Sequence, residues 1–272
     1  MRFYALFVYI FLYTPIAIIA LFSFSAGRSA SQFEGFSIKW YGRALNNPFV
    51  MDALGNSIFV AFVSATLASI LGTLAAVGLQ GIRGPVRAFF DALIYVAIMI
   101  PGIVIGIATL IALVTVFGVV NPWLAGLYQD AASAPKLSMG MGSLIAAHTM
   151  FTLALVVIIV RARLAVLESS LSEASADLYA TPFGTFRQIT LPLIAPAILA
   201  GFLLSFTFSF DDFIIAFFVA GSETTLPIYI FSSIRRGITP EVNAIGTMVM
   251  VASLLLLIIA QLILRRGNAT KR

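Results

Sequence analysis

The sequence predicts an all-α integral membrane protein whose helices cross the bilayer about six times. Of its 272 residues, 61% are hydrophobic and only 10% are charged, whereas soluble domains carry about 25% charged residues. The apolar residues form continuous runs long enough for a helical crossing, unlike the short alternating strands of a membrane barrel. The composition therefore excludes a soluble globular enzyme.

Six runs are nearly free of charge and long enough to span. They are residues 4–22, 53–82, 92–129, 137–160, 188–210 and 242–264, and the fifth continues past two aspartates to residue 220. The first run exceeds the roughly 7–15 apolar residues of a signal peptide, so we interpret it as a retained helix. We expect a single domain over residues 1–272, with its core at 53–264.

Two local features of these runs are predicted to matter for packing. Pro101-Gly102 interrupts the third run, and Gly102 and Gly106 have the spacing that lets two helices approach closely. In the first loop, the Trp40-Tyr41 pair is most simply an interfacial anchor.

Both termini are predicted to be cytoplasmic, because lysine and arginine are enriched in cytoplasmic loops. With six spans, ten of the 16 Lys and Arg residues lie on the side of the termini and six lie on the other. The short loop with Arg83 and Arg87 gives the clearest signal. The net charge of +5 is explained by this bias, so we expect no nucleic-acid partner.

The cytoplasmic connector at residues 161–196 has unusual local order. Ser170 and Glu173 have the spacing of a capping box, which predicts a short helix over 171–180. Thr181-Pro182 then has the pattern of an N-cap followed by proline at the first helical position.

The second short helix is expected to end at Leu191-Pro192. Two capped helices at a membrane face favour the docking of a partner over a passive connector.

Residues 173–196 resemble the EAA loop of the permease subunits of bacterial ABC importers. The matching residues are Glu173, Ala174, Asp177, Ala180, Phe186, Leu191 and Pro192. The chain departs from this pattern at Ser175, where the family usually has alanine, and at Tyr179, where it usually has glycine. The missing glycine should alter how the two short helices join.

The resemblance implies that the first short helix docks in a groove on a separate ATP-hydrolysing subunit. The ATPase-coupling residues that it implies are Glu173, Ala174, Asp177, Leu178, Ala180 and Phe186.

The resemblance extends over nearly the whole chain. Residues 205–213 and 233–244 are similar to the permeases of spermidine/putrescine ABC importers, as are the pairs Trp40-Tyr41, Asn56-Ser57 and Pro101-Gly102. This similarity implies a polyamine permease of the bacterial inner membrane, which is not itself an enzyme. It also implies three kinds of partner: a dimer of ATPase subunits, a second homologous permease in a heterodimer, and a periplasmic substrate-binding protein.

The chain has no ATP-binding loop of the usual kind. None of its lysines (Lys39, Lys136 and Lys271) follows a glycine, so the GxxxxGK[ST] pattern is absent. We therefore expect no cofactor in this chain and place ATP and Mg²⁺ on the partner ATPase. The lack of cysteine excludes a thiolate metal site, and no metal is expected. His148 lies within a span, where an interhelical hydrogen bond is expected rather than a proton relay.

Asp211 and Asp212 lie within the fifth run. A carboxylate inside the membrane costs about 2.5–3.5 kcal/mol on insertion scales and usually faces a bundle interior or a water-filled cavity. Phenylalanines flank the pair, and aromatic faces attract ammonium groups. The predicted substrate path comprises Asp211, Asp212, Phe208 and Phe210. In the alternative interpretation, one aspartate pairs with an arginine or caps a broken helix.

Other functions stay open. Within the same family, the solute is alternatively an amino-acid derivative or an opine. Outside it, an ion-coupled secondary transporter would need no ATPase, and the capped connector disfavours it. A membrane enzyme is disfavoured because the sequence has no polar catalytic cluster.

Overall fold

The computed structural model describes residues 2–29, 32–128, 130, 133–167, 169–237 and 239–269. Its elements are α1 (Arg2–Phe22), α2 (Lys39–Leu45), α3 (Pro48–Gly78), α4 (Gly84–Met99), α5 (Gly102–Gly126), α6 (Met141–Leu164), α7 (Ser169–Asp177), α8 (Pro182–Thr185), the π-helix η1 (Phe186–Thr190), α9 (Leu191–Asp211), α10 (Ile214–Val219), α11 (Leu226–Arg236) and α12 (Pro240–Ala269). Within the described residues, extended pairing is limited to one isolated bridge between Ser25 and Phe36. The all-α prediction is therefore confirmed for this part of the chain.

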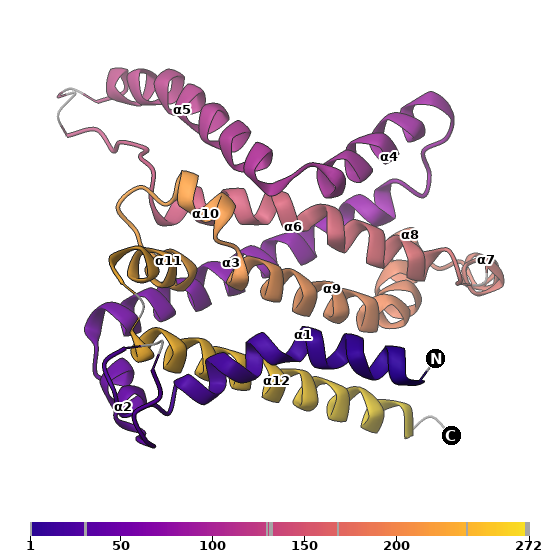
Figure 1. The fold of residues 1–272 in the computed structure, drawn as a ribbon. Helices are drawn as coiled ribbons and strands as arrows, with labels where there is room; N and C mark the ends of the chain where they lie inside the picture. Colours follow the sequence, from indigo (N-terminus) through magenta and orange to yellow (C-terminus); the bar gives the residue numbers. More distant parts are fainter. Residues whose placement is uncertain are drawn as a thin grey trace. The chain divides into compact units, whose positions relative to one another are not determined.

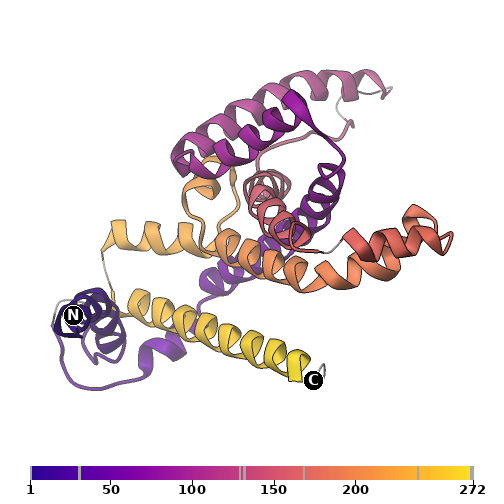
Figure 2. The ribbon, with the colours of Figure 1, turned by 90° about the vertical axis from the view of Figure 1, so that its right-hand side faces the viewer.

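The chain divides into two compact units. The first comprises Met1–Asp52 and Tyr229–Arg272, and the second comprises Ala53–Ile228. In the first unit, α12 packs against both α1 and α2. The start of α1 and the end of α12 lie at the same end of this unit (Figure 1), and the two helices diverge toward it (Figure 2).

Trp40 belongs to the core of the first unit. It is 5% exposed, and its Nε1 donates a hydrogen bond to the carbonyl oxygen of Ser25 at 2.9 Å. The Tyr41 hydroxyl lies 2.6 Å from Ser23 Oγ. The pair holds the connector between α1 and α2, so the expected role as an interfacial anchor is wrong for Trp40.

Helix α6 is the central helix of the second unit and packs against α4, α5, α9 and α10. Glycines bring its neighbours close. A Cβ atom at Gly72 of α3 would lie 2.8 Å from Val156 Cβ, and one at Gly201 of α9 would lie 3.4 Å from Val156 Cγ1. Val156 is fully buried as a result.

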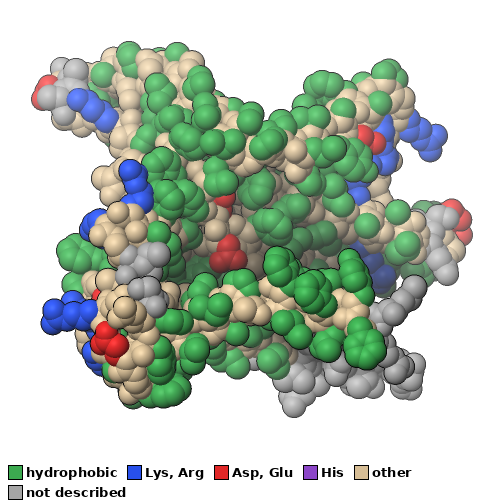
Figure 3. Space-filling view, viewed as in Figure 1, with side chains coloured by type: hydrophobic (Ala, Val, Ile, Leu, Met, Phe, Trp, Pro, Cys, Tyr) green, Lys and Arg blue, Asp and Glu red, His purple; other side chains and the backbone are tan. Residues whose placement is uncertain are grey.

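The close approach expected at Gly106 is confirmed, and its partner is α10. A Cβ atom at Gly106 would lie 2.7 Å from Phe218 Cδ2. Helices α4 and α5 diverge in a V from the Pro101 region (Figure 1). Their outer faces are mainly apolar, and charged side chains gather at the start of α4 and beyond the end of α5 (Figure 3).

Among the described residues, five helices are long and apolar enough to cross a membrane. They are Phe3–Phe22, Pro48–Gly78, Gly102–Gly126, Met141–Leu164 and Pro182–Asp211. In α12 the apolar stretch found is the shorter Pro240–Leu255. The expected sixth span therefore stays a prediction.

Two expected boundaries are wrong, both near prolines. The third span does not begin at residue 92, because Ile100 and Pro101 have extended backbone and separate α4 from α5. The proline ring disfavours the helical conformation of the residue that precedes it. The second short helix does not end at Leu191-Pro192, because α8, η1 and α9 form one continuous run. Leu191 N donates to the carbonyl of Phe186, five residues back, and such a wide π turn accommodates the proline that follows.

Candidate functional site

The first candidate site is the connector formed by α7 and α8. Thr181 is the N-cap of α8: its Oγ1 accepts a hydrogen bond from Gly184 N at 3.1 Å, and Pro182 takes the first helical position. The cap predicted from the sequence is therefore confirmed. The first short helix begins at Ser169 rather than at residue 171, so Ser170 lies inside α7 instead of preceding it.

Helix α7 ends three residues earlier than expected because the backbone turns left-handed at Tyr179. With φ of +57°, Tyr179 is the one non-glycine residue of positive φ among the described residues. Tyr179 N donates to Ala176 O at 2.9 Å, and Ala180 N donates to Ser175 O at 3.1 Å. These two bonds form a Schellman motif, in which glycine usually takes the left-handed position. Tyr179 thus adopts a backbone conformation typical of glycine, and the effect of the missing glycine on the joint stays a prediction.

A side-chain hydrogen bond joins the two short helices. Ser175 Oγ lies 2.8 Å from Thr185 Oγ1, and Ser175 is buried although most of α7 is exposed. The serine that departs from the family pattern thus ties α7 to α8. No local sequence pattern predicts this contact, because the partner lies ten positions away across an irregular turn.

The predicted ATPase-coupling residues fall into two groups. Glu173, Ala174, Asp177, Leu178 and Ala180 are exposed, whereas Phe186 is half-buried at the start of η1. Leu178 is 81% exposed and the next residue, Tyr179, is 96% exposed. The connector therefore presents an apolar tip beside two carboxylates.

The second candidate site is the break between α9 and α10. Asp212 has extended backbone, with φ of −72° and ψ of 118°, and separates the two helices. Its Oδ2 accepts a hydrogen bond from Ala216 N at 3.0 Å. Asp212 thus caps the first turn of α10, which is the structural alternative that the sequence left open for one of the two aspartates.

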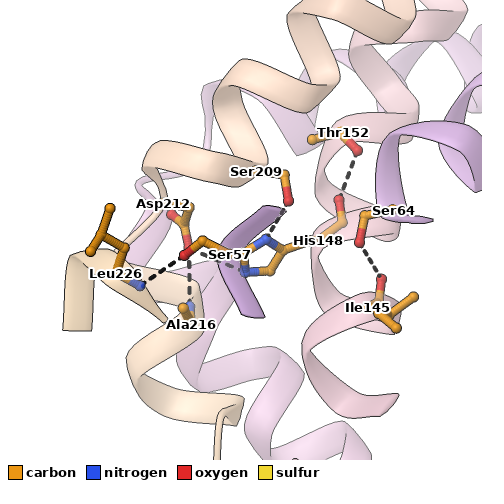
Figure 4. A network of polar contacts seen from close by, with 9 residues as sticks. All are labelled: Ser57, Ser64, Ile145, His148, Thr152, Ser209, Asp212, Ala216 and Leu226. Atoms are coloured by element: carbon orange, nitrogen blue, oxygen red, sulfur yellow. Dashed lines mark hydrogen bonds and ion pairs between the residues drawn. The ribbon is translucent and has the colours of Figure 1, made fainter. Parts of the chain in front are cut away.

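His148 of α6 contacts both sides of this break (Figure 4). Its Nδ1 lies 2.7 Å from Ser209 Oγ on α9, and its Nε2 lies 3.6 Å from Asp212 Oδ2. The imidazole is 1% exposed. The interhelical hydrogen bond expected for His148 is confirmed, and its partner is a serine that the sequence did not single out.

Further hydrogen bonds fix the elements around the break. Ser143 Oγ donates to Val219 O at 2.7 Å, at the end of α10. Ser57 Oγ of α3 accepts from Leu226 N at 2.8 Å, and Ser64 Oγ donates to Ile145 O at 3.2 Å (Figure 4). These contacts hold α10 and the following chain against α3 and α6.

Asp211 differs from Asp212 in its surroundings. Asp211 is exposed at the end of α9, whereas Asp212 is half-buried. Phe210 stacks on Phe206 with centroids 6.0 Å apart, and Phe208 contacts the ring of Phe151 edge-on at 6.3 Å. The four predicted path residues therefore lie on one stretch of α9, but only Asp211 offers a carboxylate without a helix-capping contact among those described. No cluster of three or more metal-binding side chains occurs in the described residues.

Comparison with known proteins identifies the family. Residues 68–268 match the family "Binding-protein-dependent transport system inner membrane component". The chain is 38% identical to the spermidine/putrescine transport system permease protein PotC of Haemophilus influenzae, over 96% of this chain and 95% of that protein. It is 36% identical to the putrescine transport system permease protein PotI of Escherichia coli K12, over 88% of this chain and 82% of that protein.

Solved structures of similar fold are also ABC transporters. A bacterial transporter for alginate matches with a TM-score of 0.75 at 16% identity, over 96% of this chain and 92% of that chain. The inward-facing methionine transporter MetNI matches with a TM-score of 0.60 at 16% identity, over 79% and 94%. This chain belongs to the binding-protein-dependent transport family and is a membrane permease subunit of an ABC importer.

Proposed function

We propose that the chain is the transmembrane subunit of an ATP-driven importer that moves polyamines, such as spermidine or putrescine, across the bacterial inner membrane. The observation that carries this proposal is the likeness to polyamine permeases along nearly the whole chain. Polyamines are chains of ammonium and methylene groups. An exposed carboxylate at Asp211, next to stacked phenylalanine rings, is chemically suited to such a solute.

Six spans with both termini in the cytoplasm fit this function. This topology is supported by the first unit, in which the start of α1 and the end of α12 lie at the same end (Figure 1). An even number of crossings places both termini on one side, and the distribution of arginines makes that side the cytoplasm. The α7–α8 connector then also lies in the cytoplasm, within one permease domain over residues 1–272.

Three partners complete the importer. ATP and Mg²⁺ bind to a pair of separate ATPase subunits, because this chain lacks the phosphate-binding loop. A second, homologous permease supplies the other half of the pore, and a periplasmic binding protein delivers the solute. Docking of one ATPase involves Glu173, Ala174, Asp177 and Leu178, which are exposed on α7 and at its end.

Within the pore, Asp211 is the residue that we assign to the substrate path. A carboxylate that is exposed in the isolated chain and lies at the end of a spanning segment is not expected to face lipid. Phe208 and Phe210 line the same stretch. Asp212 instead has a structural role, since it caps α10 and its carboxylate lies near His148.

Uptake measurements test the proposal. Cells that lack their own polyamine uptake would express this chain with the importer subunits encoded beside it, and accumulation of radiolabelled putrescine and spermidine would be followed. We expect saturable uptake that unlabelled polyamine inhibits and that is lost when the phosphate-loop lysine of the ATPase is replaced. Accumulation of an opine or an amino-acid derivative instead would overturn the substrate class. Uptake that persists without ATP hydrolysis would indicate an ion-coupled transporter.

A further inference from the structure

Tyr179 combines two features that rarely occur together. Its backbone takes a left-handed conformation, which side chains other than glycine, asparagine and aspartate seldom adopt. Its ring is 96% exposed, so no packing within the chain compensates for that conformation. An unfavourable backbone conformation that the surroundings maintain is a reason to look for a function.

The surrounding contacts hold this conformation firmly. The Schellman bonds from Tyr179 and Ala180 close the end of α7, and the Ser175–Thr185 contact ties α7 to α8. Thr181 caps the next helix immediately afterwards. The tyrosine is therefore presented from a fixed turn rather than from a mobile loop.

The neighbourhood of the ring defines the kind of surface that would receive it. Leu178 and Phe183, at 81% and 71% exposed, flank it in the sequence with apolar side chains. Glu173 and Asp177 are exposed on α7, which contains no basic residue. A complementary surface has an apolar pocket with a basic rim.

We propose that Tyr179 is an anchor that selects the ATPase partner: its ring enters an apolar pocket of the ATPase that a glycine in this position would leave empty. This inference rests on the proposed docking of an ATPase at α7 and adds to it the residue that discriminates between ATPases. Aromatic side chains are frequent anchors of protein interfaces, because they bury much area at low entropic cost.

The test separates the ring from the backbone. Tyr179→Gly and Tyr179→Asn remove the ring but suit the left-handed conformation, whereas Tyr179→Phe keeps the ring. The full permease complex would be reconstituted in nanodiscs, and binding measured for the ATPase that copurifies with the unaltered complex. We expect the dissociation constant to rise at least about tenfold for Y179G and Y179N and to change less than about threefold for Y179F. Unchanged binding of both Y179G and Y179N would overturn the proposal.

A second measurement tests selection. An ATPase from an importer whose permease has glycine at this position should bind Y179G at least about tenfold more tightly than the unaltered chain, because the ring then has no pocket. Equal binding would contradict selection. Ala174→Arg distinguishes this inference from the docking proposal. If A174R still binds the ATPase, docking at α7 itself is wrong. If A174R fails to bind while Y179G and Y179N bind normally, only the role of Tyr179 is wrong.

Discussion

The α7–α8 connector and the α9–α10 break both interrupt a helical path, but different groups hold them in place. In the connector, the main contacts are backbone bonds and a threonine cap, and most side chains point outward. In the break, buried side chains make the contacts: His148 meets Ser209 and Asp212. The exposed side chains of the connector can therefore contact a partner. The buried side chains of the break hold the fold, whereas Asp211 beside them is exposed. Substitutions should therefore affect binding in the connector, stability at the buried residues of the break, and transport at Asp211.

The largest effect is expected for Ala174→Arg. Ala174 is exposed, so the change should alter stability by less than about 0.5 kcal/mol. A bulky charge within the ATPase contact should weaken docking about 100-fold, and uptake should be lost. Copurification of the ATPase and polyamine uptake would both be measured.

Ala176→Arg is the matched control. Ala176 is also exposed on α7, but two residues along a helix point about 200° apart. The Ala176→Arg variant should still bind the ATPase and take up polyamine. Equal loss in both variants would show that any arginine on α7 disrupts the connector, which would contradict the binding role assigned to one face.

Substitutions of the two aspartates at the break should have different effects on uptake. Asp211→Asn removes an exposed charge without touching a cap, so we expect about tenfold weaker uptake at unchanged thermal stability. Asp212→Asn keeps an oxygen that can cap α10, so its uptake should fall less. Transport and substrate-stimulated ATPase activity would be measured on assembled complexes. If both variants transport polyamine at the normal rate and apparent affinity, neither carboxylate lines the path.

The connector and the break differ in how far their sequences predict their structures, for physical reasons. The Thr181-Pro182 cap is a local pattern, and it was predicted correctly. The left-handed turn at Tyr179 was missed, because tyrosine is not a residue that signals positive φ. The family pattern usually has glycine at this position, and glycine is typical of a left-handed conformation. The pattern therefore indicates the conformation that the tyrosine does not.

At the break, the sequence predicts which residues are important but not which contacts they make. Asp211, Asp212 and His148 stood out because charged and ionisable residues are rare in spans. The contact of His148 with Ser209 joins residues 61 positions apart, and the sequence contains no local pattern for such a pair. The sequence of residues 188–220 also does not indicate where α9 ends. Asp212, which caps α10, and its exposed neighbour Asp211 are the same residue type, so the sequence cannot distinguish them.

A smaller effect, on stability alone, is expected for His148→Ala. The substitution removes the contact with Ser209 and leaves a cavity in a buried site, at a cost of about 2–3 kcal/mol. Thermal unfolding in detergent would measure it. Ser209→Ala should cost less, and the double variant should show coupling of about 1 kcal/mol. Strictly additive effects would mean that the hydrogen bond does not hold the break.

The smallest effect concerns the entrance to the connector, where α6 ends. Arg161 Nη1 donates to Asp91 Oδ1 of α4 at 2.5 Å, and Arg87 Nε lies 3.6 Å from Asp91 Oδ2. The hydrogen bond from Arg161, aided by the charge of Arg87, lowers the pKa of the Asp91 carboxyl below its usual value. A carboxyl with a lowered pKa in the folded state stabilises the fold above its unfolded pKa, and this contribution is lost as the pH falls through the folded pKa.

Asp91→Asn should therefore lower the melting temperature slightly, by the same amount from pH 8 to about pH 5. The difference should shrink as the pH falls below about 4 and vanish only where the Asp91 carboxyl is protonated in the folded state as well. Arg87→Gln is the control and should lower it less, because its contact with Asp91 is longer. ATPase binding should stay unchanged in both variants, since neither residue lies on α7 or α8. A melting difference that grows as the pH falls below 4 would contradict the ion pair. Loss of ATPase binding would mean that contacts beneath the connector, and not only its caps, set the position of the docking helix.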